Sequence, residues 1–273
     1  MKYILLVALS TLIISCQTSP PKQELSLPSD TVGLAPLAKS PPSVLILDHK
    51  YFVVTYDRPT RLARHVTYSL TATQLKNSAN ATRSNKFKAD PLLADYKELI
   101  VKPSEYLKTG YDQGHLANSK DFGFNQEAQD ETFVMSNMAP QKPNLNRDAW
   151  LKLEDQVRKW ACGEEEVKVI TGPILGKNLK TLKSGLPIPN QFFKIVLDET
   201  PPKKMLAFIY NQTDKGDVMA EREIKLTELK KEVLPQINDT EKTNFSKYPI
   251  VPIKDWKSFD CFTKMKPAKI VKK

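Results

Sequence analysis

The sequence contains few of the residues on which several common kinds of site depend. Its 273 residues include three cysteines, three histidines and nine glycines. It has no glycine-rich dinucleotide fingerprint, no P-loop, and no cluster of cysteines and histidines at zinc-binding spacing. An internal repeat with a period of about 20 to 50 residues is also absent, which excludes solenoids and propellers. Any catalytic or binding site must therefore be of another kind.

The N-terminal segment lacks an apolar run long enough to cross a bilayer. Residues 3–14 are almost wholly apolar, whereas a spanning helix needs about 20 such residues. Ser15 then precedes Cys16, a pattern typical of a bacterial lipoprotein signal. We expect residues 1–15 to be a signal peptide and Cys16 to carry a lipid. The alternative is a plain secretory peptide with an incidental cysteine. Gln17, which is not an aspartate, favours an outer-membrane address facing the periplasm or the cell surface.

Residues 16–43 are rich in proline and nearly free of aromatic residues. Such a composition indicates a semi-extended tether that lifts the following domain off the membrane. A leader without any role is the alternative. Residues 44–273 contain no second linker, and a hydrophobic content of 40% in the whole chain is enough to bury one good core. We therefore expect one folded domain over 44–273, ending in a basic tail at 264–273.

The cysteines indicate one possible disulfide. If Cys16 carries a lipid, Cys162 and Cys261 remain, in a compartment that permits oxidation. We expect them to pair and to hold the C-terminal segment against the end of a helix. Two buried free thiols remain the alternative, because spacing alone does not prove a pairing.

Acidic residues are fewer than basic ones. There are 31 Asp and Glu against 41 Lys and Arg, a formal net charge of +10, and loss of Lys2 with the signal peptide reduces it by one. This balance favours polyanionic partners, whose phosphates bind basic side chains without sequence preference. The alternative is a basic surface made for anionic lipid or envelope glycolipid.

The segment Tyr-Asp-Gln-Gly-His at 111–115 is the most informative part of the chain. His115 lies among small and polar residues, and a neutral imidazole can take a proton from water near pH 7. Downstream, Asn146 offers a neutral oxygen of the kind that magnesium accepts while it keeps most of its waters. A base and a cation together suit phosphodiester hydrolysis. His49 and His65 have no such neighbours, and we interpret them as structural.

A helix is expected at 146–161, and it would present several polar groups together. Asn146, Trp150, Glu154 and Arg158 recur every four residues, so they lie along one side of a helix. Each also has a simpler interpretation. Asn146 would serve as a helix N-cap, and Glu154 with Arg158 would form an exposed ion pair worth a few tenths of a kcal/mol.

These segments resemble the DNA/RNA non-specific endonucleases of the ββα-metal (His-Me finger) superfamily. The family signature reads Asp-Arg-Gly-His, followed by Asn-x-x-Pro-Gln, Leu-Asn-x-x-x-Trp and Leu-Glu. The later parts stand here at residues 137–141, 145–150 and 153–154. The similarity extends from about residue 51 to 262 and takes in Arg83 with Asp90-Pro91, residues 169–173 and residues 188–190. One departure is Gln113, which stands where the family has arginine.

The resemblance implies an α+β fold, the ββα-metal nuclease fold, with a central antiparallel sheet flanked by helices. It implies that His115 is the general base and that Asn146 binds Mg²⁺, with Mn²⁺ as a second candidate metal. Glu154 would hold metal-bound waters. Arg83 matches the position that contacts the scissile phosphate, and Arg158 matches a second arginine near the metal.

Substrate contacts are also expected from the residues around the altered position. Gln113 supplies only neutral hydrogen bonds where arginine would supply a charge. Arg147, beside the expected metal ligand, and Lys120, after the histidine, are candidates to replace that charge.

The sequence therefore predicts a magnesium-dependent, sugar-non-specific endonuclease that is tethered to the cell envelope and cleaves DNA and RNA to 5′-phosphate products. The alternative is a lipoprotein of the same fold that has lost activity with Gln113 and captures extracellular DNA.

Periodicity also predicts the coarse secondary structure. Strands are expected at 51–56, 64–71, 132–136, 167–171, 192–197 and 205–210. Besides the helix at 146–161, a second helix is expected at 221–234, ending before Pro235.

Overall fold

The computed structural model describes residues 43–238 and 240–262. The predicted signal peptide, Cys16, nearly all of the tether and the basic tail lie outside these residues. Among the helices in the described ranges, none is long and apolar enough to cross a membrane.

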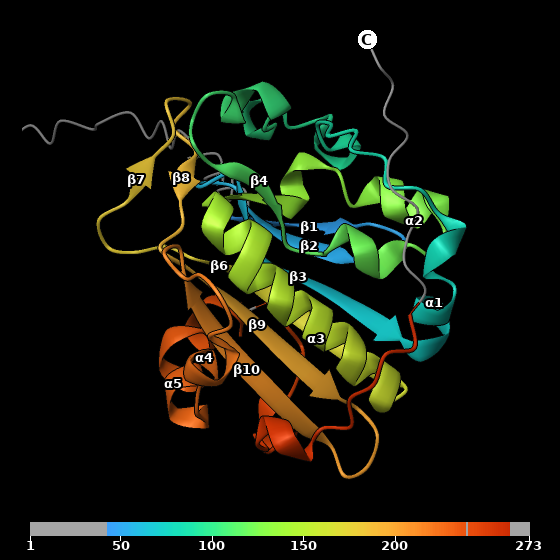
Figure 1. Cartoon of the computed structure of the whole chain (residues 1–273). Coiled ribbons are helices and arrows are strands. Elements are labelled where there is room, and N and C mark those ends of the chain that lie inside the picture. Colours follow the sequence, from blue (N-terminus) through green and yellow to red (C-terminus); the bar gives the residue numbers. More distant parts are fainter. Residues whose placement is uncertain (1–42, 239, 263–273) are drawn as a thin grey trace, which may run out of the picture. The chain divides into compact units, whose positions relative to one another are not determined.

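Within the described residues, the core is a six-stranded antiparallel sheet in the order β1-β2-β3-β6-β9-β10 (Figure 1). Its strands are β1 (Val44–Asp48), β2 (Val53–Asp57), β3 (Leu62–Thr71), β6 (Glu166–Ile174), β9 (Gln191–Asp198) and β10 (Lys204–Asn211). Two small two-stranded sheets pair β4 (Asp112–His115) with β5 (Met138–Gln141), and β7 (Lys180–Thr181) with β8 (Pro187–Ile188). The expected antiparallel α+β architecture is confirmed.

The α-helices are α1 (Ala72–Lys76), α2 (Gln126–Glu131), α3 (Trp150–Gly163), α4 (Met219–Arg222), α5 (Leu226–Glu232) and α6 (Leu234–Ile237). The predicted helix at 146–161 is confirmed in position, but a turn of π-helix at Leu145–Ala149 forms its start. The π-turn matters because it holds Asn146. Figure 1 shows α3 running diagonally across the sheet.

Alternation along β9 places two different cores on the two faces of the sheet. Phe192 and Val196 belong to the cluster that contains α3, and Trp150 and Trp160 of α3 are fully buried there. Phe193, Ile195 and Leu197 belong to the cluster that contains α5 and α6. The sheet therefore has one face covered by α3 and an opposite face covered by α5 and α6.

Two sequence-based assignments are wrong. Residues 132–136 form no strand: after α2 the chain turns, with Phe133 and Val134 donating backbone hydrogen bonds to Asp130 and Glu131. The apolar side chains of this segment reflect burial and not extension. The helix expected at 221–234 is divided among α4, α5 and α6, and between α4 and α5 the Ile224 N–H donates to the Ala207 carbonyl of β10. This bond interrupts the helical hydrogen-bond ladder.

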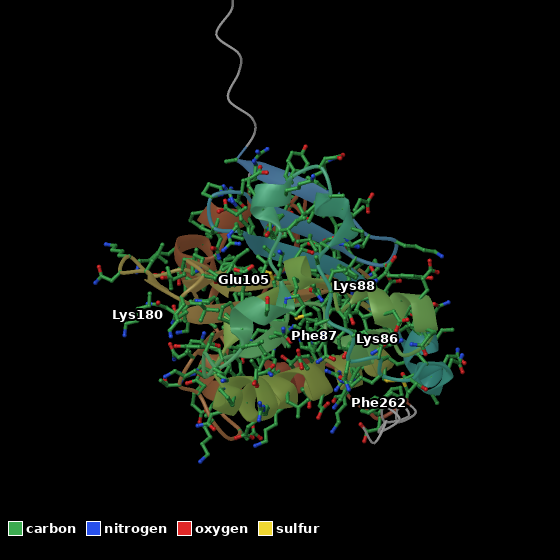
Figure 2. The ribbon with its side chains drawn as sticks, turned by 90° about the horizontal axis from the view of Figure 1, so that it is seen from above. Lys86, Phe87, Lys88, Glu105, Lys180 and Phe262 are labelled. Carbon is green, nitrogen blue, oxygen red and sulfur yellow. A yellow bond between two sulfur atoms is a disulfide. The ribbon has the colours of Figure 1, made fainter. Side chains whose placement is uncertain are left out.

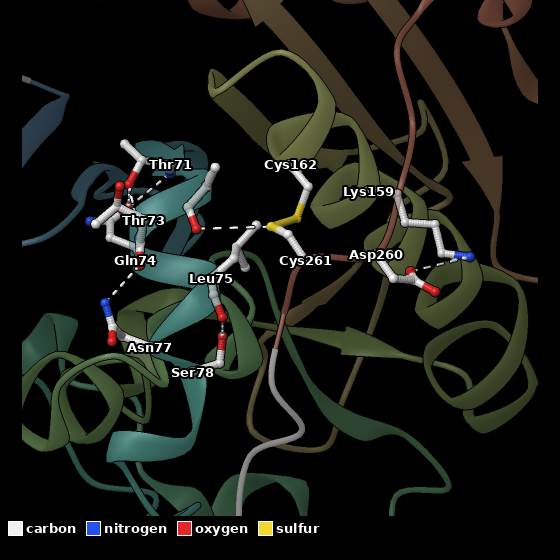
Figure 3. The surroundings of a disulfide bond; sticks show 11 residues. Thr71, Thr73, Gln74, Leu75, Asn77, Ser78, Lys159, Cys162, Asp260 and Cys261 are labelled. Carbon is white, nitrogen blue, oxygen red and sulfur yellow. Dashed lines mark hydrogen bonds and ion pairs between the residues drawn. A yellow bond between two sulfur atoms is a disulfide. The ribbon is translucent and has the colours of Figure 1, made fainter.

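Cys162 and Cys261 form a disulfide, with their Cα atoms 5.6 Å apart (Figure 3). The pairing is therefore confirmed in the structure. It holds the C-terminal segment against the end of α3. The same segment passes so close to Gly163 that a Cβ there would lie 2.2 Å from the Lys257 carbonyl oxygen. Only glycine fits the end of this helix without a shift of the neighbouring chain.

Candidate active site

A cavity of about 500 Å³ opens where β4 meets the start of α3. It is lined by Arg83, Phe87, Asp112, Gln113, His115, Asn118, Ser119, Lys120, Asn146, Arg147, Leu151 and Glu154. Figure 2 labels Phe87, one of these lining residues, together with its sequence neighbours Lys86 and Lys88. Seven of the expected site residues thus line one cavity, although they come from four separate segments.

Glycine packing and one asparagine fix the strand that carries the histidine. A Cβ on Gly114 would lie 2.1 Å from the Gln141 side-chain oxygen, so any other residue there would require the buried Gln141 side chain of β5 to move. Beyond the strand, the Asn137 side chain accepts a hydrogen bond from the Ala117 N–H at 2.8 Å and donates to the Ala117 carbonyl at 3.0 Å. The chain on either side of His115 is therefore held rigidly.

His115 is largely buried, yet it lines the cavity, and one of its ring nitrogens is unsatisfied. The residue is 9% exposed, and its ring centroid lies 5.7 Å from that of Phe87 and 4.9 Å from that of Phe133. Its Nε2 has no hydrogen-bond partner among the described residues. Burial, followed by the positive charge of Arg83, lowers the pKa of His115 to about 3. The imidazole is therefore neutral near pH 7, which is the form that a general base requires.

Asn146 lies inside the π-turn, so the expectation that it caps the helix is wrong. Its backbone N–H donates to the Lys142 carbonyl, and the N-cap position belongs to Asn144. Its side-chain Nδ2 donates to Asp112 Oδ2 at 2.9 Å. Because the nitrogen is held by Asp112, the amide is oriented, and its oxygen accepts no hydrogen bond from the part of the chain described. That oxygen is a hard donor for a cation.

Glu154 of α3 lines the cavity and is 5% exposed. Asn118 Nδ2 donates a hydrogen bond to its Oε2. Burial raises the pKa of the Glu154 carboxyl to about 7, against the opposing effect of the Lys194 charge. A divalent cation nearby would favour the ionised form.

Two further cationic side chains face the cavity. Arg83 is half-buried, lies 5.1 Å from the Phe133 ring centroid and donates to Ser119 Oγ and Asn85 Oδ1. Burial lowers the pKa of Arg83 from its usual value. Lys120 is exposed, and partial burial of its ammonium followed by the charge of Arg158 lowers its pKa. Both are placed to meet an anion in the cavity.

Gln113, at the position of the family arginine, and Arg147, one of its two expected substitutes, both make hydrogen bonds within the protein. Gln113 Nε2 donates to the Pro103 carbonyl at 3.3 Å. The exposed Arg147 binds both carboxylate oxygens of Asp112, at 2.8 and 2.6 Å. Since the same Asp112 orients Asn146, Arg147 acts on the cavity through this shared carboxylate.

Arg158 does not line the cavity, and the expected exposed ion pair with Glu154 is wrong. Arg158 is 3% exposed. Its Nη1 lies 2.8 Å from Asp121 Oδ1, and its Nη2 contacts Asp155. Tyr68 also donates to Asp121 at 2.8 Å. Arg158 therefore belongs to a buried ionic group beneath the cavity.

Lys194 is a member of this group that sequence reasoning missed. It is 1% exposed, its Nζ lies 4.8 Å from the Trp150 ring centroid, and that Nζ has no hydrogen-bond partner in the described ranges. Burial lowers its pKa, and the charge of Glu154 opposes this shift. The available signal was a single lysine inside the apolar run of residues 192–197.

The donor set fits a hard cation better than a soft one. Within residues 43–238 and 240–262, no three His, Cys, Asp or Glu side chains gather as a metal cluster. The oxygens that line the cavity instead include the oriented amide of Asn146 and the carboxyl of Glu154. Such a sparse oxygen set suits magnesium, which usually keeps several waters.

Known proteins support the same interpretation. The family model described as DNA/RNA non-specific endonuclease matches residues 35–246. A nuclease of Nostoc sp. is 34% identical over 203 residues, covering 70% of this chain and 71% of its own. The mitochondrial endonuclease G of Caenorhabditis elegans is 29% identical, covering 81% of this chain and 69% of its own. A chain in the crystal structure of the EndoG/EndoGI complex matches with a TM-score of 0.63 and 26% identity, covering 69% of this chain and 83% of that one. This chain therefore belongs to the DNA/RNA non-specific endonuclease family and is a hydrolytic endonuclease.

Proposed function

We propose that this chain is a magnesium-dependent, sugar-non-specific endonuclease, that it leaves 5′-phosphate ends, and that Cys16 anchors it to the bacterial envelope. The observation that carries the catalytic part is that a neutral His115 lines the same cavity as Asn146, Glu154 and Arg83. A base, oxygen ligands and an anion-binding cation are the groups that phosphodiester hydrolysis requires.

Each side chain has a distinct part in the proposed reaction. The His115 imidazole takes a proton from the water that attacks phosphorus. The Arg83 guanidinium neutralises charge on the non-bridging oxygens, while its contacts with Ser119 and Asn85 hold it in place. The bond from phosphorus to the 3′ oxygen breaks, so the phosphate stays on the 5′ end.

Asn146 and Glu154 are the residues that would hold the cation, Asn146 directly and Glu154 through waters. When bound, Mg²⁺ supplies stabilisation of negative charge on the phosphate and on the departing oxygen. Asp112 orients the Asn146 amide, and Asn118 orients the Glu154 carboxyl. These two hydrogen bonds hold the Asn146 and Glu154 side chains in place in the free protein.

Plasmid nicking by the purified mature chain tests the activity. We expect supercoiled DNA and a single-stranded RNA to be cut with Mg²⁺, and cutting to stop with excess chelator. The ends should be substrates for ligase without prior phosphorylation, because they carry 5′-phosphate. Cleavage that persists in chelator, or ends that need phosphorylation, would contradict the proposal.

Envelope attachment is tested separately. With a radiolabelled fatty acid, the wild-type chain should be labelled and should fractionate with membranes, whereas Cys16→Ser should be unlabelled. A wild-type chain recovered unlabelled from the soluble fraction would refute the anchor without bearing on catalysis.

A further inference from the structure

A second cavity lies beside the catalytic one, and the catalytic mechanism makes no use of it. Its volume is about 600 Å³. Its lining includes Tyr111, Lys142, Asn178, Lys180, Asn190 and Thr213. Among the residues that the structure describes, no acidic side chain lines it. Two lysines, several amides and one aromatic ring are together suited to phosphate and to a nucleobase.

The backbone joins this second cavity to the catalytic one. In the β4–β5 pair, Asp112 is opposite Gln141, and Asp112 lines the catalytic cavity. Tyr111 and Lys142 are the next residues beyond that pair, and both line the second cavity. Along an extended strand, Tyr111 lies about 13 Å from His115. A strand of nucleic acid leaving the catalytic cavity in this direction would meet Tyr111 next.

The walls of the second cavity are rigid. Gln212 is buried and donates to the Pro140 and Pro189 carbonyls at 2.7 and 3.0 Å. Its Oε1 accepts the Lys142 backbone N–H at 2.8 Å. One side chain thus ties the end of β5 to the segment between β8 and β9. Figure 1 shows the β7–β8 hairpin close to β4, and Figure 2 shows Lys180 projecting outward from it.

The charge in this cavity is not neutralised. Neither Lys142 nor Lys180 has a carboxylate within ion-pair distance among the described residues, and nearby Asp214 is held by Arg222 at 2.6 Å. A smaller cavity of about 330 Å³ elsewhere provides the contrast. There Lys168 pairs with Glu241 at 3.0 Å, and Lys203 pairs with Glu199 at 2.6 Å. Among the described residues, the second cavity therefore combines two lysines with no carboxylate on its lining, whereas Glu199 and Glu241 line the smaller cavity beside its lysines.

The Tyr111 ring packs against the core but is only partly buried. Tyr111 is half-buried, so its position is fixed by the core, yet it pairs with no other aromatic ring in the described part of the chain. A fixed ring at a basic cavity is the arrangement on which single-stranded nucleic acids stack without sequence preference.

We propose that the second cavity binds a nucleotide of the strand being cut, outside the scissile linkage, with Lys142 and Lys180 on phosphate and Tyr111 against a base. The inference rests on the proposed endonuclease function, because it assigns the cavity to the same substrate. If the second cavity binds the substrate in this way, kcat/KM should be higher for a long strand than for a dinucleotide.

The test compares two substrates, a dinucleotide with one linkage and a single-stranded 16-mer. The readout is the ratio of kcat/KM for the long substrate to that for the short one. The double variant Lys142→Ala/Lys180→Ala should lower this ratio about tenfold and reduce the slope of log kcat/KM against log salt by about 1.4 for the 16-mer, as expected for two lost contacts to single-stranded phosphate. Tyr111→Leu should lower the ratio at least about fivefold, and Tyr111→Phe should preserve it.

The matched control is Lys242→Ala/Lys247→Ala, which removes the same charge from the smaller cavity. An equal fall with both lysine pairs would show general attraction and overturn the proposal, as would no fall with either. A chain that cuts neither substrate would instead refute the proposed function. In that case, fluorescence anisotropy of the labelled 16-mer, in chelator and with His115→Ala as the background, still decides: Kd should rise with the Lys142/Lys180 pair and not with the control pair.

Discussion

The two faces of the central sheet bury different kinds of groups. Under α3, four charged residues lie in the interior: Asp121, Glu154, Arg158 and Lys194. Their charges cancel in sum, but the Lys194 Nζ has no hydrogen-bond partner in the described chain and the pKa of Glu154 is raised. Under α5 and α6, the side chains of β9 and β10 that face inward are apolar.

Charged groups on the second face form pairs that satisfy one another. Glu241, for example, accepts hydrogen bonds from Lys168 at 3.0 Å and from Thr243 at 2.7 Å. An incompletely satisfied buried charge is costly and is found mainly where chemistry needs it. We infer that the face covered by α5 and α6 mainly stabilises the fold. The face covered by α3 buries charged groups that lower stability and that lie beneath the candidate site.

The largest effect should come from the histidine on the α3 face. His115→Ala should lower kcat on plasmid DNA by roughly 10² to 10⁴, the usual contribution of a general base. Binding of DNA in chelator should change little, because the base acts on the transition state. Near-normal turnover would remove His115 from the mechanism.

Removing one partner of the buried ion pair should lower the free energy of unfolding more than a small apolar truncation on the other face of the sheet. Arg158→Met leaves Asp121 buried without its cation, and should reduce the free energy of unfolding by about 3 to 5 kcal/mol. Ile195→Val should cost only about 0.5 to 1.5 kcal/mol. Urea denaturation of both variants makes the comparison. Equal costs would mean that the two faces do not differ as described.

Lys194→Met should have an effect that changes with pH. The pKa of Glu154 in the folded chain, about 7, is above its ordinary value, so its stabilising contribution is present at low pH and is lost as pH rises through 7. The Lys194 charge lowers the pKa of Glu154. Removing this charge should therefore increase the stability that is lost when Glu154 ionises at high pH.

We expect Lys194→Met to leave the unfolding free energy unchanged or higher at pH 5, and to lower it by roughly 1 to 2 kcal/mol at pH 8. Ile195→Val is the control, because its cost should not depend on pH. Denaturation at the two pH values measures both. A Lys194→Met effect that is the same at pH 5 and pH 8 would show no coupling to Glu154.

The smallest effect should come from Gln113. Gln113→Arg places a permanent charge at the cavity, but Arg83 and Lys120 already supply charge there. Steady-state rates should therefore rise by less than about tenfold or stay the same. A sharp fall would mean that the glutamine has a specific task, which its hydrogen bond to the Pro103 carbonyl would then explain.

Much of the sheet follows from the sequence, because its strands are long and apolar. The expected strands at 64–71, 192–197 and 205–210 match β3, β9 and β10 to within two residues at each end. The short strand β4 did not follow, since Asp-Gln-Gly-His has no apolar alternation and forms a strand only through its pairing with β5.

The site residues could be predicted where a sequence motif specifies both the residue types and the spacing between them. His115, Asn146 and Glu154 do line one cavity. The partners that orient them were not predictable, because Asp112 and Asn118 act through contacts 34 and 36 residues away in sequence. Lys194 was also missed, because an apolar run is usually interpreted as core. Only the tertiary structure shows that its lysine faces the buried charges beneath α3.

The most direct test of the central claim, that the α3 face holds a metal-dependent catalytic centre, is a magnesium titration of plasmid cleavage by Asn146→Ala. Asn144→Ala is the matched control, since Asn144 is exposed, lies two residues earlier and makes no side-chain cap hydrogen bond. The account predicts that Asn146→Ala abolishes cleavage or requires a much higher magnesium concentration, and that Asn144→Ala behaves like the wild type. A titration curve for Asn146→Ala that overlays the wild-type curve would contradict it.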